Sequence, residues 1–109
     1  MPLLGQGPAA GIGGSFGDFT RNDLVSVGIT SVTIADANPR NAIAITNSST
    51  AAQVITVNFG FSQAVAGKGI VLQAGQTITD SDQPPYKCYQ GVITAISDAA
   101  SGQLSIFER

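Results

Sequence analysis

Few side chains in this sequence could carry acid–base, nucleophilic or metal chemistry. The absence of histidine removes the commonest general base and zinc ligand, and with them every Ser-His-Asp or Cys-His triad. Glu108 is the sole glutamate, so a glycosidase would need two aspartates from loops. Asp80 and Asp82 are close in sequence, but this spacing favours a solvated turn over a catalytic pair. We therefore expect no enzymatic activity.

Motifs for cofactors are equally weak. Asp80-Ser81-Asp82 could begin a calcium loop, but the glycine and the terminal glutamate of an EF-hand loop do not follow. The glycines between Gly11 and Gly17 match a nucleotide-binding loop only superficially, because no Gly-Lys-Ser/Thr is present. Cys88 is the only cysteine, so no intrachain disulfide can form, and we predict a buried structural thiol. The sequence predicts neither a metal nor another cofactor.

Two tyrosines are the remaining candidates for a binding site. Tyr86 and Tyr89 could stack on a sugar ring, or they could cap a sheet or fill a protein interface with their hydroxyls bonded at its rim. The absence of tryptophan favours the interface.

The amino-acid composition limits the kinds of partner that this chain can bind. At 109 residues the chain can bury one core. Charged residues make up 11% of the chain, against about 25% in an ordinary soluble domain. A net charge of −2 gives little repulsion between copies, so self-association is favoured. The five cations are scattered and form no basic stripe, so we expect no nucleic-acid partner. The apolar runs are too short to cross a bilayer, so we expect no membrane partner.

Residues 22–109 have the texture of short strands between turns. Alternation predicts one strand with Ile55, Val57, Phe59 and Phe61 on a single face, and a final strand with Leu104 and Ile106 inside. A phase shift between Ile29 and Val32 predicts a bulge or a bend. Further strands are expected over 42–46, 70–72, 77–79, 86–89 and 91–97, whereas two prolines exclude a central strand over 80–85.

This spacing predicts an all-β fold. We expect a single β-sandwich or jelly-roll-like domain of about seven or eight short antiparallel strands.

Residues 1–21 differ from the rest because they are rich in glycine and show no periodicity of 2 or 3.6. We expect an extended N-terminal arm that is held by a neighbouring subunit. Phe16 and Phe19 are its foremost candidate anchors, although they could instead fold back on their own domain. The full set of predicted arm contacts is Leu3, Leu4, Ile12, Phe16 and Phe19.

Three segments carry a resemblance to a known family. Residues 40–47 (RNAIAITN) form an alternating strand that ends in Asn, and residues 69–78 (GIVLQAGQTI) form two strands around Ala-Gly. Residues 89–97 (YQGVITAIS) and 102–106 (GQLSI) form a closing hairpin. This layout resembles the small β-sandwich virion proteins of tailed bacteriophages, particularly capsid decoration or cement proteins, although Tyr89 stands where such proteins often have a tryptophan.

The resemblance implies a non-enzymatic protein that sits on a capsid, as a trimer or another small oligomer, and stabilises the shell. Its expected partners are further copies of itself, with a trimer favoured, and a major capsid protein. Its expected location is the virion, after synthesis in the host cytoplasm. Two alternatives stay open: a carbohydrate-binding module that uses Tyr86 and Tyr89, and a tail or adsorption component.

Overall fold

A computed structural model describes residues 20–109, so the predicted arm contacts (Leu3, Leu4, Ile12, Phe16 and Phe19) lie outside the described residues. The described part of the chain is all-β, as predicted, and contains no helix that is long and apolar enough to cross a membrane. Its eight strands are β1 (Arg21–Val27), β2 (Val32–Ala35), β3 (Ala42–Asn47), β4 (Ile55–Phe59), β5 (Ile70–Leu72), β6 (Thr77–Ser81), β7 (Ile93–Ser97) and β8 (Gly102–Glu108).

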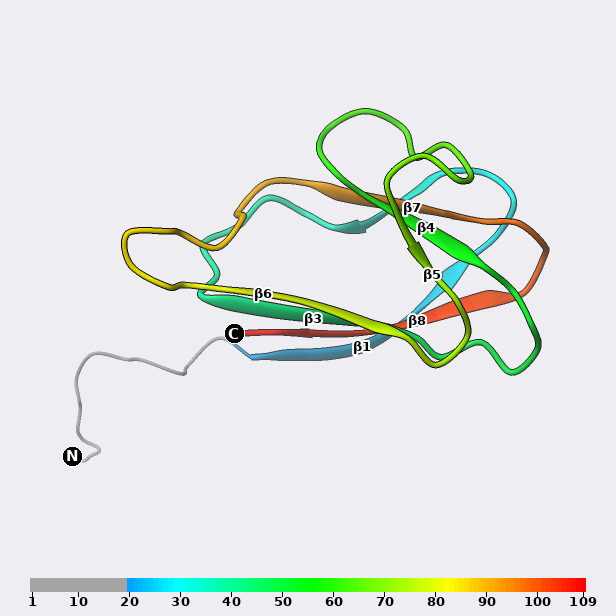
Figure 1. Cartoon of the computed structure of the whole chain (residues 1–109), viewed down its shortest axis with the longest axis horizontal. Coiled ribbons are helices and arrows are strands. Elements are labelled where there is room, and N and C mark those ends of the chain that lie inside the picture. Colours follow the sequence, from blue (N-terminus) through cyan, green and yellow to red (C-terminus); the bar gives the residue numbers. More distant parts are fainter. Residues whose placement is uncertain (1–19) are drawn as a thin grey trace.

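The strands form two four-stranded antiparallel sheets that face one another (Figure 1). The first sheet has the order β1-β8-β3-β6, and the second has the order β2-β7-β4-β5. Both sheets contribute alternate residues to one buried core, including Ile45 and Leu104 from the first sheet and Ile55 and Ile93 from the second. The alternating pattern of the sequence is therefore the pattern of a strand with one face in this core.

The closing hairpin predicted from residues 89–97 and 102–106, one of the three features that carry the resemblance, is wrong. β7 pairs with β2 and β4 in the second sheet, whereas β8 pairs with β1 and β3 in the first. The chain crosses between the sheets through Ser101, which has a positive φ of 66°, and Gly102. A strand with one buried face has the same alternation in a hairpin as in such a crossing, so the pattern could not distinguish them.

Two other strand predictions need correction. Phe61 does not continue the inner face of β4 but lies beyond it, with 84% of its surface exposed. Residues 86–89 are a loop rather than a strand, and that loop projects from one end of the molecule in Figure 1. The phase shift between Ile29 and Val32 is confirmed as the point where the chain leaves the first sheet for the second.

A buried ionic cluster closes one end of the space between the sheets. The Glu108 carboxylate on β8 pairs with Arg21 Nη1 at 2.9 Å and lies 3.7 Å from Arg40 Nε. Arg40 is fully buried and donates to the carbonyl oxygens of Asp36 at 2.8 Å and Tyr89 at 2.7 Å. This single side chain therefore joins the loop before β3 to the loop before β7.

We expect Glu108→Gln to lower the free energy of unfolding by about 3–5 kcal/mol, because it leaves a buried arginine without its counter-ion. Lys87→Ala is the control, since it breaks an exposed ion pair with Asp82 and should cost less than about 1 kcal/mol. Urea unfolding of both variants measures the difference. Equal stabilities would refute the structural role of the cluster.

A second prediction concerns the crossing between β7 and β8. A Cβ at Gly102 would lie 2.6 Å from the carbonyl oxygen of Val27, which is backbone and cannot move aside cheaply. A Cβ at Gly28 would meet nothing within 4 Å. Gly102→Ala is therefore expected to lower the thermal midpoint by several degrees, whereas Gly28→Ala should leave it nearly unchanged. A tolerated Gly102→Ala would contradict the close approach seen at this crossing.

Candidate interaction surfaces

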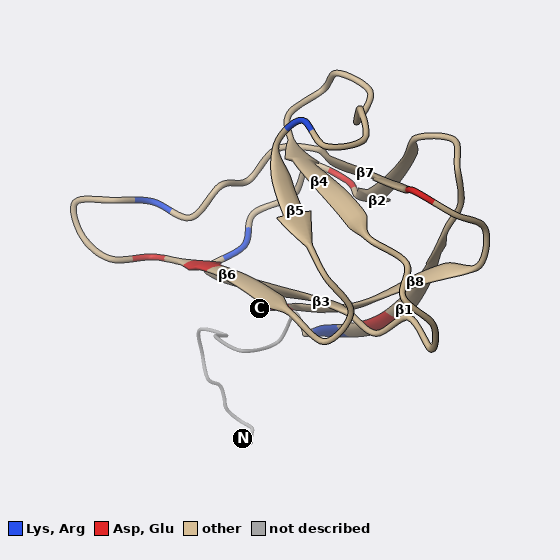
Figure 2. Ribbon diagram, turned by 45° about the vertical axis from the view of Figure 1, so that its right-hand side comes forward, with Lys and Arg blue, Asp and Glu red and all other residues tan. Residues whose placement is uncertain are grey.

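The outer face of the first sheet carries no charged residue. Each of its four strands turns three side chains away from the core, and all are apolar or uncharged polar groups. Charged residues lie mainly in loops and near strand ends (Figure 2). The outward residues are Asn22, Leu24 and Ser26 of β1, Ala42, Ala44 and Thr46 of β3, Thr77, Thr79 and Ser81 of β6, and Gln103, Ser105 and Phe107 of β8.

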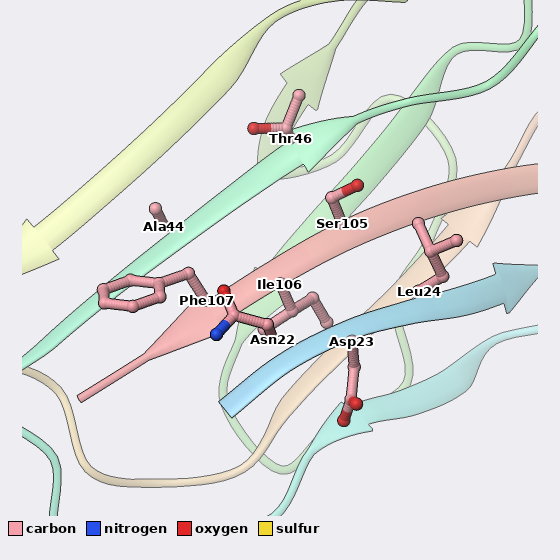
Figure 3. Close-up of a pocket in the computed structure, with 8 residues that line it drawn as sticks. All are labelled: Asn22, Asp23, Leu24, Ala44, Thr46, Ser105, Ile106 and Phe107. Atoms are coloured by element: carbon pink, nitrogen blue, oxygen red, sulfur yellow. The ribbon is translucent and has the colours of Figure 1, made fainter. Parts of the chain in front are cut away.

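A shallow groove of about 340 Å³ runs over this face. Leu24 and Phe107 flank it, and the short side chains of Ala44 and Ser105 leave its floor open, whereas Asp23 points away from it (Figure 3). Leu24 is 65% exposed. The face thus combines two large apolar groups with a floor that a partner's side chains can enter.

The outer face of the second sheet is different because the protein's own β4–β5 loop, residues 60–69, lies over it (Figure 1). The amide of Gly67 donates to Thr56 Oγ1 at 2.9 Å, and Thr94 Oγ1 donates to the carbonyl oxygen of Ser62 at 3.0 Å. Within residues 20–109, this loop covers Thr56 and Thr94 at the centre of the face, whereas Thr33 and Val71 on its edge strands stay exposed.

The structure brings the predicted contact residues Tyr86 and Tyr89 together around Asp80. The Tyr86 hydroxyl donates to both oxygens of the Asp80 carboxylate, at 2.9 and 3.1 Å, and the amide of Tyr89 donates to Asp80 Oδ2 at 2.9 Å. Tyr89 is otherwise engaged, since its hydroxyl donates to Val92 O at 2.9 Å and its ring centroid lies 5.4 Å from that of Phe59. Only Tyr86, at 53% exposure, presents its ring to solvent.

The other reactive groups organise the loop that follows β6. Asp82 accepts a hydrogen bond from the amide of Cys88 at 2.8 Å, and this bond, assisted by Lys87, holds the pKa of Asp82 below its ordinary value. Cys88 is buried, as predicted, and burial raises the pKa of its thiol. No group of three His, Cys, Asp or Glu residues that could hold a metal ion occurs in residues 20–109.

The uncharged face was not among the sites that the sequence singled out. Its signal is present, because the residues that alternate with the core residues of β3 and β8 are all uncharged. Recognising it requires knowing that these strands are neighbours in one sheet.

Comparisons with protein-family models, curated proteins and solved structures gave no significant match.

The hydrogen bond between Tyr86 and Asp80 generates a prediction about pH. This bond raises the pKa of Tyr86 above its ordinary value, because deprotonation would place a phenolate against a carboxylate. Asp80→Asn should lower that pKa, whereas Asp82→Asn should leave it raised. Titration of the tyrosine ring carbons by NMR measures both. An unchanged Tyr86 pKa in Asp80→Asn would show that the bond is not formed in solution.

Proposed function

We propose that this chain is a non-enzymatic structural protein of a bacteriophage virion that decorates the capsid and binds the shell through the outer face of the β1-β8-β3-β6 sheet. The observation that carries the proposal is the uncharged, uncovered state of that face, on which Leu24 and Phe107 border a groove. Charged residues are depleted in the centres of protein interfaces, and large apolar residues supply their anchors.

The strand orders support a jelly-roll domain. In that fold two four-stranded sheets are built from two Greek keys, as the orders β1-β8-β3-β6 and β2-β7-β4-β5 require. Jelly rolls occur in viral capsid proteins and in lectins, so the fold alone does not choose between the shell and a glycan.

The state of the reactive residues favours the structural role over an enzyme or a glycan-binding module. Asp80 and Asp82 are bonded to the backbone of their own loop, and Cys88 is buried. Tyr89 is committed to the contact with Phe59, which leaves Tyr86 without a second exposed ring for a sugar platform.

The size of the face supports the participation of a second contact. Four strands about 4.8 Å apart and about six residues long cover a flat area on the order of 400 Å², whereas a standard interface buries about 800 Å² on each partner. A contact through this face alone would therefore reach about half the standard size. The arm, residues 1–21, supplies the further contact in this proposal.

The chain offers a matched pair of variants for a test. Leu24 on the face and Ile29 in the β1–β2 loop are 65% and 67% exposed. We expect Leu24→Arg to reduce the amount of this protein in purified particles at least about tenfold, because an unpaired charge would be buried in the interface. Ile29→Arg should be incorporated normally. Quantitative mass spectrometry of particles from the encoding phage, complemented with each variant, measures the occupancy.

Circular dichroism of each purified variant confirms that both are folded. Absence of the wild-type chain from particles, or its presence in tails alone, would overturn the capsid role. Equal incorporation of the two arginine variants would overturn the assignment of the face.

A further inference from the structure

A second groove, of about 390 Å³, opens between the two sheets where β5 and β6 are the edge strands. Ile70 of β5 and Ile78 of β6 form its walls, Phe59 and Tyr89 contribute to its lining, and Tyr86 lies at its rim. Its size is that of a site that encloses a large side chain or a small ligand. Thr79 and Asp80 complete the lining, and the Asp80 carboxylate is already bonded to the Tyr86 hydroxyl and the Tyr89 amide. The remaining lining is hydrophobic, so an apolar group is the occupant that it suits.

The rim of this groove also offers backbone hydrogen bonds. β6 pairs with β3 on one side only, so alternate residues of β6 direct their N–H and C=O groups toward the open edge. An extended peptide can pair with such an edge while one of its side chains enters the adjacent pocket. The groove therefore fits an extended segment with a single large apolar residue among small ones.

The N-terminal arm contains such a segment. Phe16 is preceded by Gly13-Gly14-Ser15 and followed by Gly17, so its neighbours bring no bulk to a close approach between backbones. Nineteen residues precede the described part of the chain, which begins at Thr20 beside β1. β1 is the edge strand opposite β6 in the first sheet.

Geometry favours the groove of a neighbouring copy over that of the same chain. One line of register partners crosses the first sheet, from Arg21 through Glu108 and Ile43 to Asp80. Three strand spacings separate its ends by about 14 Å. Phe16 lies five residues before Arg21 and can reach about 17 Å when fully extended. Within one copy, Phe16 would therefore need a nearly fully extended arm laid straight across the sheet to arrive at Asp80, which lines the groove.

We propose that Phe16 of one copy occupies the groove between β5 and β6 of the next copy, with the arm running along the β6 edge. This inference depends on the proposed function in one respect: copies of the protein must lie side by side. Because the arm leaves one edge of the sheet and the groove lies at the other, the contact is head-to-tail and closes into a ring when the rotation between copies permits.

Disulfide trapping between two differently labelled full-length chains tests this contact. One chain carries Ser15→Cys, which keeps Phe16 in place, and the other carries Tyr86→Cys at the rim of the groove, while the native Cys88 is buried. We expect a mixed disulfide dimer under mild oxidation. Ile29→Cys is the control partner, because Ile29 is also exposed but belongs to the β1–β2 loop.

A mixed dimer no more abundant than with Ile29→Cys would overturn the inference. So would a double variant, Ser15→Cys with Tyr86→Cys, that closes only within its own chain. As a second measurement, Tyr86→Arg at the rim of the groove should reduce the solution mass found by light scattering, whereas Thr77→Arg on the outer face of the first sheet should not. Failure here, with Leu24→Arg still lost from particles, would refute the arm contact and leave the proposed function intact.

Discussion

Each of the two sheets can bury only one face against the other sheet, so the surfaces available to a partner depend on what covers the two outer faces. The second sheet is covered by residues 60–69, which are held by hydrogen bonds to Thr56 and Thr94. The first sheet has no such cover in the described part of the chain. Its outer face is uncharged and carries the large apolar side chains of Leu24 and Phe107, which is the composition of the centre of a protein interface.

The ends of the molecule are fixed by polar rather than apolar contacts. At one end Arg40 and Glu108 are buried together, and at the other the fully buried Asn47 donates to the carbonyl oxygens of Gln53 and Leu72, both at 2.9 Å. Such groups are costly to bury unless they are paired, so they specify one arrangement of the loops.

Sequence reasoning recovered the elements better than their arrangement. Apolar residues at every second position, Ile43 and Ile45 in β3 and Leu104 and Ile106 in β8, identified these two strands because their inner side chains all face one core. It could not place β7 and β8 in different sheets, since partner choice depends on the whole chain. The strand predicted over residues 86–89 does not form. The amides of Cys88 and Tyr89 donate to the carboxylates of Asp82 and Asp80 instead of pairing with a neighbouring strand. The uncharged face became visible only with the sheet order.

The most direct test of the central claim, that this face is an interface, is hydroxyl-radical footprinting of the free protein and of the protein bound to particles. Leu24 and Phe107 border the groove on the face, whereas Phe61 projects from the loop over the other sheet. The account predicts that binding lowers the oxidation of Leu24 and Phe107 and leaves Phe61 as reactive as before. Unchanged oxidation of Leu24 and Phe107, with protection of Phe61, would contradict it.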